Sequence, residues 1–436
     1  MWMKRLKAIR VRVYPTPEQE RSFLRIAGCC RLVYNLGLVQ RRDFWRQHRN
    51  ITGRGIGWHG QKRELTALQA LPEAAFLKEA PSHCLQMALQ DLDAAYDRFF
   101  EGLAGYPRPR RKGENDAFTF PDPTQIRVDV RSERLVLPKF GRRRDDGGAL
   151  KLRMHRRPYG ELRRVTIVRE GRHWYASILM RTRARNAPMP APEASDVIGI
   201  DRGVAAPFVT SDGAGFGVQV EGIPEKRKQT RLAKALSRTR RGSKRREKAR
   251  LRLLAHKSKM ARRRRDQIHK ITAAIAKNHR IAVIEKLRVR AMTASARGTA
   301  EEPGRNVAQK AGLNREILDR GWGEFRRQLG YKLAWRGGQL LEVPARNTSR
   351  TCAACGHVAA ESRISRDLFR CAVCRHEDDA DVNAAIEICR RGLIVLGLHA
   401  TPAGTVGDAR GALCTGTAAK REKKNDGINA ETPVDA

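Results

Sequence analysis

Two Cys-x-x-Cys pairs near the C-terminal end constrain this chain more than any other feature of its sequence. Cys352 and Cys355 form the first pair, and Cys371 and Cys374 form the second after fifteen intervening residues. Each pair can present two thiolates from one tight turn, and two such pairs complete a tetrahedron around zinc. We therefore expect these four cysteines to hold a structural Zn²⁺ ion.

The remaining cysteines and the nearby histidines fit this assignment. His357 and His376 could each replace a cysteine as ligand, but four thiolates already complete the set. The other cysteines show no paired spacing, a usage that fits a reducing cytoplasm with one structural metal. They are Cys29, Cys30, Cys84, Cys389 and Cys414.

The charge of the chain indicates a polyanionic partner. Its 88 Lys and Arg residues face 46 Asp and Glu residues, which gives a net charge of +42. An excess of this size favours nucleic acid, held mainly through its phosphates, over an anionic membrane or a merely basic surface. No apolar run reaches the roughly 18 residues of a transmembrane helix, and the basic N-terminus continues into alternation rather than a signal-peptide core. We expect no membrane partner.

The positive charge is densest between Lys226 and Lys270, where 21 Lys and Arg residues face two acids. Gly242-Ser243 divides this run. We expect a helical hairpin over residues 226–278 whose broad cationic face binds nucleic acid. A charged helix that is merely solvated explains the pattern less well, because side chains of one charge sign repel one another unless an anion lies between them. A thin apolar stripe supplies its packed edge: Leu232, Leu236, Leu251, Leu254, Ile268 and Ile271.

The N-terminal region combines a strand with helices. Residues 7–14 alternate apolar and basic side chains, as a half-buried strand does. Thr16 then provides an N-cap and Gln19 a capping box, and helical patterns continue to about residue 103. Beyond a Pro-rich basic linker at 105–112 the period changes to two.

Short strands occupy the region after this linker, with a hairpin expected at Glu170-Gly171. A second Pro-rich linker follows at 187–192. We expect the N-terminal strand to join this β-domain, with the helical segment as an insertion.

Three acids stand where phosphate chemistry would need them. Asp201 and Glu285 each end an apolar strand, and Asp381 precedes an apolar helical segment. Reacting groups collect at the carboxyl ends of strands in open α/β sheets, and converging carboxylates bind divalent cations that hydrolyse phosphodiesters. Each acid alone is weak evidence: the first two could be turn residues. Asp381 could be an N-cap, with Asp378 and Asp379 as rivals.

Three further segments complete the pattern. Residues 287–313 are polar and contain glycine, as in a mobile loop. Asn314 is suited to cap a helix that stops at Gly337-Gly338. The tail, residues 401–436, has little to bury and is predicted to be disordered.

Five segments together resemble the TnpB family, in family order. These transposon-encoded, OrfB-type proteins are RNA-guided DNA endonucleases related to type V CRISPR effectors. The resemblance extends from the N-terminal strand to about residue 400 and is most specific in the C-terminal half. The segments are residues 199–204, 283–287, 312–329, 347–352 and 380–385.

The resemblance implies a multidomain α/β fold: a RuvC-like nuclease domain of the RNase H fold with an inserted zinc ribbon, preceded by a wedge β-barrel domain carrying a helical recognition insertion. The implied boundaries are 1–15 and 113–186 for the wedge domain, 16–112 for the helical insertion, 195–348 and 378–400 for the nuclease domain, and 349–377 for a zinc ribbon that binds target nucleic acid.

The resemblance also implies site residues and partners. Asp201, Glu285 and Asp381 would bind catalytic Mg²⁺, and Cys352, Cys355, Cys371 and Cys374 would bind structural Zn²⁺. A guide RNA from the transposon end and double-stranded target DNA would be the partners, in the cytoplasm at the nucleoid. Arg202 departs from the family pattern, which commonly has leucine there.

Two alternatives to a guided, Mg²⁺-dependent DNA endonuclease remain open. One is a transposase that performs strand transfer itself. The other is a nuclease-inactive, RNA-guided DNA-binding regulator, against which the presence of all three acids argues.

Overall fold

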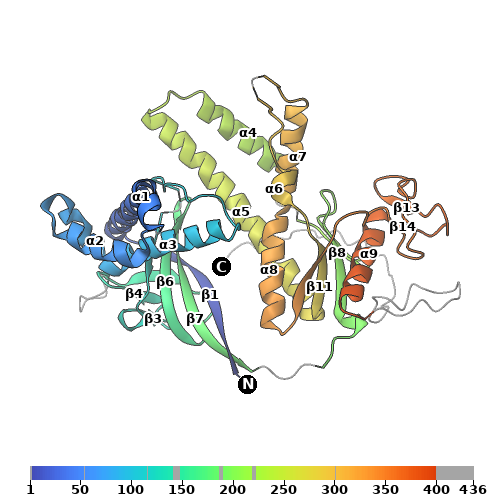
Figure 1. The fold of residues 1–436 in the computed structure, drawn as a ribbon, viewed down its shortest axis with the longest axis horizontal. Coiled ribbons are helices and arrows are strands. Elements are labelled where there is room, and N and C mark those ends of the chain that lie inside the picture. The colour runs from blue at the N-terminus through green and yellow to red at the C-terminus, as the bar shows by residue number, and fades with distance from the viewer. Residues whose placement is uncertain are drawn as a thin grey trace, which may run out of the picture. The chain divides into compact units, whose positions relative to one another are not determined.

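A computed structural model of the chain shows two compact units (Figure 1). The first comprises Met1–Ala187 with Gln229–Ser258, and the second comprises Pro188–Lys228 with Lys259–Ala436. The structure describes residues 2–53, 55–114, 116–140, 148–185, 190–218, 222–299 and 301–398. The predicted disordered tail lies outside these residues.

An antiparallel sheet of seven strands, in the order β2-β6-β7-β1-β5-β4-β3, organises the first unit. Strand β1 lies between β7 and β5, so that Val13 pairs with both Trp174 and Leu152. The N-terminal strand therefore joins the later strands, as its alternation predicts, and β6 and β7 form the predicted hairpin. The strands are β1 (Trp2–Tyr14), β2 (Ala117–Phe120), β3 (Arg127–Asp129), β4 (Arg134–Val136), β5 (Leu150–Arg153), β6 (Glu161–Glu170) and β7 (His173–Arg185).

Helices between β1 and β2 pack on this sheet. The predicted capping box starts the first of them: Thr16 N donates to Gln19 Oε1 over 3.0 Å, and Gln19 N donates to Thr16 Oγ1 over 3.2 Å. Phe23 is fully buried, with its ring centroid 5.0 Å from that of Trp174. The helices are α1 (Pro17–Thr52), α2 (Trp58–Ala70) and α3 (Ser82–Phe100), with 3₁₀ turns at Pro72–Glu79 and Pro123–Gln125.

Helix α1 is long and apolar enough to cross a membrane by length and composition alone, although no membrane helix is expected from the sequence. Half of its most apolar window is buried inside the protein. Ile26, Val33 and Leu38 belong to the core shared with the sheet. Packing against the sheet therefore accounts for the apolar character of α1.

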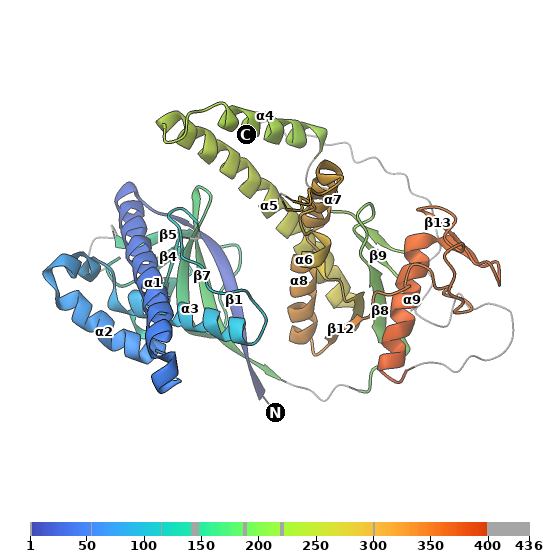
Figure 2. The ribbon, with the colours of Figure 1, turned by 45° about the horizontal axis from the view of Figure 1, so that its top comes forward.

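The basic segment forms two helices, α4 (Ile223–Ser237) and α5 (Lys244–Asn278), which lie side by side in Figures 1 and 2. Gly242 adopts a φ of +82° in the turn between them. Arg246 Nη1 closes the turn by donating to the carbonyl oxygens of Leu236 and Thr239 over 3.1 and 2.9 Å. The predicted helical hairpin is confirmed. Its stripe differs at one place, because Leu253 is buried whereas Leu254 is 38% exposed.

A five-stranded sheet, in the order β10-β9-β8-β11-β12, organises the second unit. Strands β8, β11 and β12 are parallel, and β9 runs antiparallel to both β8 and β10. The carboxyl ends of the three parallel strands therefore meet at one edge of the sheet. The strands are β8 (Val197–Asp201), β9 (Phe208–Thr210), β10 (Gly215–Phe216), β11 (Ile281–Glu285) and β12 (Gln339–Val343).

Helices cover both faces of this sheet. Alternate residues of β8 and β11 enter different cores, as the near-continuous apolar runs of a doubly covered sheet predict. Helix α9 (Ala380–Val395) packs Ile388 and Leu393 against one face, whereas α8 (Trp322–Trp335) and the end of α5 pack against the other. The remaining elements are a 3₁₀ turn at Ala194–Asp196, α6 (Val289–Met292), α7 (Val307–Arg320), β13 (Leu368–Arg370) and β14 (Glu377–Asp379).

The helix that was expected to begin at Asn314 and end at Gly337 is two helices in the structure, and the first of them begins before Asn314. Helix α7 begins at Val307, and Gly321, with a φ of +69°, separates it from α8. Asn314 lies inside α7, where its amide donates to the carbonyl oxygens of Thr293 and Ala294, over 3.1 Å each. The cap prediction was wrong because Asn314 bonds to a preceding turn of the chain rather than to its own helix.

Gly199 allows α9 to approach β8 closely. A Cβ atom at this position would lie 2.1 Å from the carbonyl oxygen of Ala385 and 2.6 Å from the backbone nitrogen of Cys389. These backbone atoms cannot move without displacing the helix. The small residue at Gly199 therefore sets the distance between α9 and the sheet.

We predict that Gly199→Ala destabilises the second unit by about 1–3 kcal/mol, the usual cost of overpacking. Gly330→Ala is the matched control, because its new Cβ would meet only Leu340, at 3.6 Å, inside helix α8. Alanine there favours the helix by about 0.5–1 kcal/mol. Urea denaturation of both variants measures the difference, and equal midpoints would contradict the packing argument.

Candidate active site and metal centre

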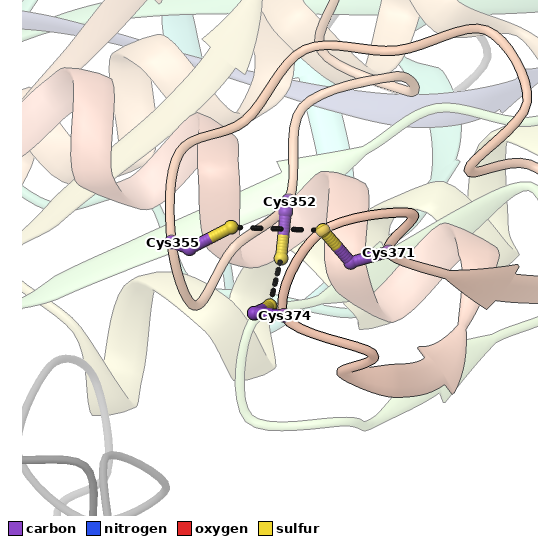
Figure 3. A group of neighbouring side chains, drawn as sticks. All are labelled: Cys352, Cys355, Cys371 and Cys374. Atoms are coloured by element: carbon purple, nitrogen blue, oxygen red, sulfur yellow. Dashed lines mark hydrogen bonds between the residues drawn. The ribbon is translucent and has the colours of Figure 1, made fainter.

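The four cysteines of the two pairs meet in space. Their Sγ atoms all lie within 4.8 Å of one another (Figure 3), with Cys352 and Cys374 3.7 Å apart and Cys355 and Cys371 3.6 Å apart. Four thiols at this spacing fit the tetrahedral site of a structural zinc ion. The predicted ligand set of four cysteines is therefore brought together as expected.

Each pair sits in the same kind of turn. Cys352 N donates to the His357 carbonyl oxygen and Cys371 N to that of His376, over 2.9 Å in both cases. A residue with positive φ completes each turn, Gly356 at +76° and Arg375 at +58°. The two histidines thus serve the turns through their backbones, and the cysteine cluster does not include their side chains.

Hydrogen bonds lower the pKa of one cysteine of the second pair, which favours its thiolate form. Burial acts to raise the pKa of Cys371, but hydrogen bonds from the backbone N–H groups of Cys374 and Val373 and from the side chains of Cys355 and Cys374 lower it to about 6. Burial raises the pKa of Cys352 to about 12. A cation among the four sulfurs would favour the thiolate form of all of them.

A buried asparagine joins the first pair to helix α9. Asn383 is fully buried in the first turn of this helix. Its Oδ1 accepts from Ala353 N and its Nδ2 donates to the Thr351 carbonyl oxygen, both over 2.9 Å. Because these groups flank Cys352, the position of the cysteine cluster and the start of α9 are fixed together.

The predicted acids of the two strands lie at the same edge of the sheet. Asp201 ends β8 and Glu285 ends the neighbouring parallel strand β11, one residue beyond the paired Ile200 and Ile284. Glu285 is only 7% exposed. Burial, followed by the negative charges of Glu285 and Asp381, raises the pKa of Asp201 to about 7. Asp201 therefore lies close enough to Glu285 and Asp381 to experience the charge of both.

Asp381 approaches this edge from the first turn of α9. Its rival Asp379 is the N-cap, with a side chain that accepts from Asp381 N over 2.9 Å and Val382 N over 3.1 Å. The Asp381 carboxylate therefore has no capping role. Its Oδ1 lies 3.7 Å from Nη2 of Arg363, and burial followed by Asp379 raises its pKa.

Two buried side chains contact Glu285 directly. Arg202 is 5% exposed and its Nη2 donates to the Glu285 carbonyl oxygen. Thr348 is 3% exposed and its hydroxyl donates to Glu285 Oε1. Sequence reasoning missed the contacts of Thr348 and Arg363, although Thr348 lies inside one of the five resembling segments.

The carboxylates are spaced differently from the cysteines. Among the described residues, the four cysteines are the group of potential metal ligands that lie close enough together to bind a single ion. The carboxylates of Asp201, Glu285 and Asp381 are not gathered as tightly. A pair of cations about 4 Å apart would need a wider set of ligands than one ion. Carboxylate oxygens are among the donors that hard cations such as Mg²⁺ prefer.

Three family profiles match the chain. They are a helix-turn-helix domain of the OrfB/IS605 type at residues 1–50, an OrfB/IS605 probable transposase at 178–296, and a Cas12f1-like TNB domain at 322–388. Over the first of these ranges, the described residues form strand β1, a short connection and most of helix α1, which continues to Thr52.

Relatives match nearly the whole chain. A putative RNA-guided DNA endonuclease, InsQ of Escherichia coli K12, is 39% identical over 394 residues, which are 90% of this chain and 94% of InsQ. A putative RNA-guided DNA endonuclease of Streptomyces pristinaespiralis is 31% identical and covers 89% of both chains. The fold is similar to that of Cas12f1 in a complex with guide RNA and target DNA, with a TM-score of 0.52, 14% identity, and coverage of 88% of this chain and 99% of Cas12f1.

We predict that the purified chain contains about one Zn²⁺ ion per molecule. Cys371→Ser removes one of four thiolates and is expected to lose the metal and to expose residues 349–377 to proteolysis. Cys29→Ser, which changes a buried cysteine outside the cluster, is the control and keeps its zinc. Elemental analysis measures both, and full zinc in Cys371→Ser would contradict the site.

The pKa of Asp201 predicts how stability depends on pH in Mg²⁺-free buffer. Because the folded state holds this proton more firmly than the unfolded state, ionising Asp201 costs stability as the pH rises from about 4 to about 7. Asp201→Asn removes that cost, on the order of 4 kcal/mol at most for such a shift. Thermal unfolding is expected to show a stabilised variant at pH 8 and little difference at pH 4; an equal gain at both values would contradict the prediction.

Proposed function

This chain belongs to the TnpB family of RNA-guided DNA endonucleases, the OrfB-type proteins of insertion sequences, and on that premise we propose that it cuts DNA at a RuvC-like site made by Asp201, Glu285 and Asp381. Residues 195–348 and 378–400 form the nuclease domain in this proposal, and residues 349–377 form the inserted zinc ribbon. The five-stranded mixed sheet, with its parallel strands β8, β11 and β12, supports an RNase H type of fold.

The observation that carries the proposal is the convergence of acids from separate elements: Asp201 ends β8 beside Glu285 at the end of β11, within reach of the charge of Asp381 on α9. Burial and the charges of Glu285 and Asp381 raise the pKa of Asp201 to about 7. A protein gains nothing for its stability from such an arrangement, so a perturbed group of this kind favours a functional site. Bound Mg²⁺ would offset the repulsion, and it would supply an activated water and stabilise the leaving oxygen of the phosphodiester.

One positively charged side chain of the protein lies beside the proposed site. Arg363 lies beside Asp381 and remains 30% exposed on its side chain, so its guanidinium can hold Asp381 in place and reach a phosphate of the DNA strand. Arginine suits this role because its planar fork pairs with phosphate oxygens. The zinc ribbon thereby contributes charge to the site as well as a rigid support for α9.

The basic hairpin α4–α5 and the first unit are the proposed binding surfaces for the guide RNA from the transposon end and for double-stranded target DNA. Base pairing with the guide would read the target, while the protein contacts mainly the backbones. Residues 1–15 and 113–186 form the wedge domain in this proposal, and residues 16–112 form the helical recognition insertion. We expect the protein to act in the cytoplasm, at the nucleoid.

We predict that the protein with its guide RNA and Mg²⁺ cleaves a matched plasmid, and that Asp201→Asn lowers the cleavage rate by at least about 10³-fold, in line with the loss of a principal electrostatic group. Asp212→Asn, which changes an exposed acid of the β9–β10 turn, is the control and is expected to cleave normally. Gel analysis of the plasmid measures both.

Three outcomes of this assay distinguish the candidates. Cleavage by Asp201→Asn at the wild-type rate would overturn the proposed site. Products joined to a second DNA would favour a transposase that performs strand transfer. Guided binding without any nicking by the wild-type protein would favour a nuclease-inactive regulator.

A further inference from the structure

We propose that Thr348 is a positioning residue for Glu285, and that through Thr348 the turn leading into the zinc ribbon sets the orientation of this acid. The inference rests on the proposed function, because it assigns a partner to one of the three proposed metal-binding carboxylates.

The contact between Thr348 and Glu285 is buried and specific. Thr348 is 3% exposed and Glu285 is 7% exposed. The Thr348 hydroxyl donates to Glu285 Oε1, and its other acceptor within reach is the Ala345 carbonyl oxygen at 3.2 Å. A hydroxyl has one proton, and an ionised carboxylate is the stronger acceptor. The bond occupies one carboxylate oxygen and leaves Oε2 for a cation.

The backbone of Glu285 is held separately. Arg202 Nη2 donates to the Glu285 carbonyl oxygen, and β11 is paired with β12 as far as Glu285 and Val343. These bonds fix the main chain but not the side-chain torsions of a glutamate. Thr348 supplies the missing constraint, because its hydroxyl binds the end of the side chain.

A tight turn holds Thr348 itself. Asn347 adopts a φ of +61°, which asparagine tolerates better than most residues. Its carbonyl oxygen accepts from Arg350 N and Thr351 N over 3.0 Å each, and from Thr351 Oγ1 over 2.8 Å. With three donors on one carbonyl group, the turn is rigid.

The same turn is bonded to the zinc knuckle and to α9. The Thr351 carbonyl oxygen accepts from Asn383 Nδ2 over 2.9 Å, and Cys352 follows directly. Asn383 lies two residues beyond Asp381 on α9. The short chain segment from Thr348 to Cys352 is therefore hydrogen-bonded to Glu285 through Thr348 and to the Asp381 helix through Asn383.

Such outer partners of metal-binding carboxylates typically change metal affinity or activity by about 10–100-fold when they are removed. Thr348→Val keeps the shape of the side chain but removes the hydroxyl, whereas Thr348→Ser keeps the hydroxyl. Thr66→Val is the unrelated control, because the Thr66 hydroxyl bonds only within the exposed surface of α2.

The test measures Ca²⁺ binding by calorimetry and Mg²⁺-dependent cleavage for each variant in its complex with guide RNA. We expect Thr348→Val to weaken Ca²⁺ binding and to raise the half-maximal Mg²⁺ concentration by about 10-fold or more, with its zinc content unchanged. Thr348→Ser is expected to restore both quantities to within about threefold of the wild-type values.

Two results would overturn the inference: Ca²⁺ binding by Thr348→Val equal to that of the wild-type protein, or equal losses in Thr348→Val and Thr348→Ser accompanied by loss of zinc. Asp201→Asn is measured alongside. If Asp201→Asn is inactive while Thr348→Val behaves as wild type, the inference alone fails. If Asp201→Asn cleaves normally, the proposed function fails, and the inference fails with it.

Discussion

The convergence of carboxylates at one edge of the five-stranded sheet is the constraint on which the rest of the second unit depends. Strands β8 and β11 are parallel neighbours, so the acids that end them must lie side by side. Burial and the nearby charges of Glu285 and Asp381 make Asp201 hard to ionise. Folding works against this cluster, and the surrounding elements must hold it in place.

The segment that carries the four cysteines helps to hold the acids in place. The chain leaves the sheet after β12, forms the two turns that carry the cysteine pairs and returns as α9, with Asp379 capping the helix and Asp381 in its first turn. Asn383 ties the first turn to α9 by two buried hydrogen bonds. Because a structural zinc ion stabilises small domains that lack a core of their own, it can fix a carboxylate without taking part in chemistry.

Spacing and periodicity predicted the parts of this structure that depend on local sequence. The Cys-x-x-Cys pairs predicted the cysteine cluster, and the Thr16–Gln19 capping box predicted the start of α1. The run of basic residues divided at Gly242 predicted the helical hairpin. Each of these patterns depends on residues that are near one another in the sequence.

Contacts between distant residues could not be predicted in the same way. Asn314 has a good capping sequence, but its amide bonds to Thr293 and Ala294 because the tertiary fold brings them near. Thr348 and Glu285 are 63 residues apart, and no local pattern pairs them. The sequence also could not decide whether Asp379 or Asp381 caps helix α9, since both acids are suited to the start of a helix. The hydrogen bonds of the cap identify Asp379 as the capping residue.

Arg202 shows how the cluster tolerates a buried cation. Burial lowers the pKa of this guanidinium, and the charges of Glu285, Glu342 and Asp201 oppose that effect. A buried cation is costly unless it is paired and hydrogen-bonded. Its bond to the Glu285 main chain, rather than to a carboxylate, leaves the acidic oxygens available to cations. Arg202 thus joins the ends of β8 and β11 and reduces the net negative charge without blocking the proposed ligands.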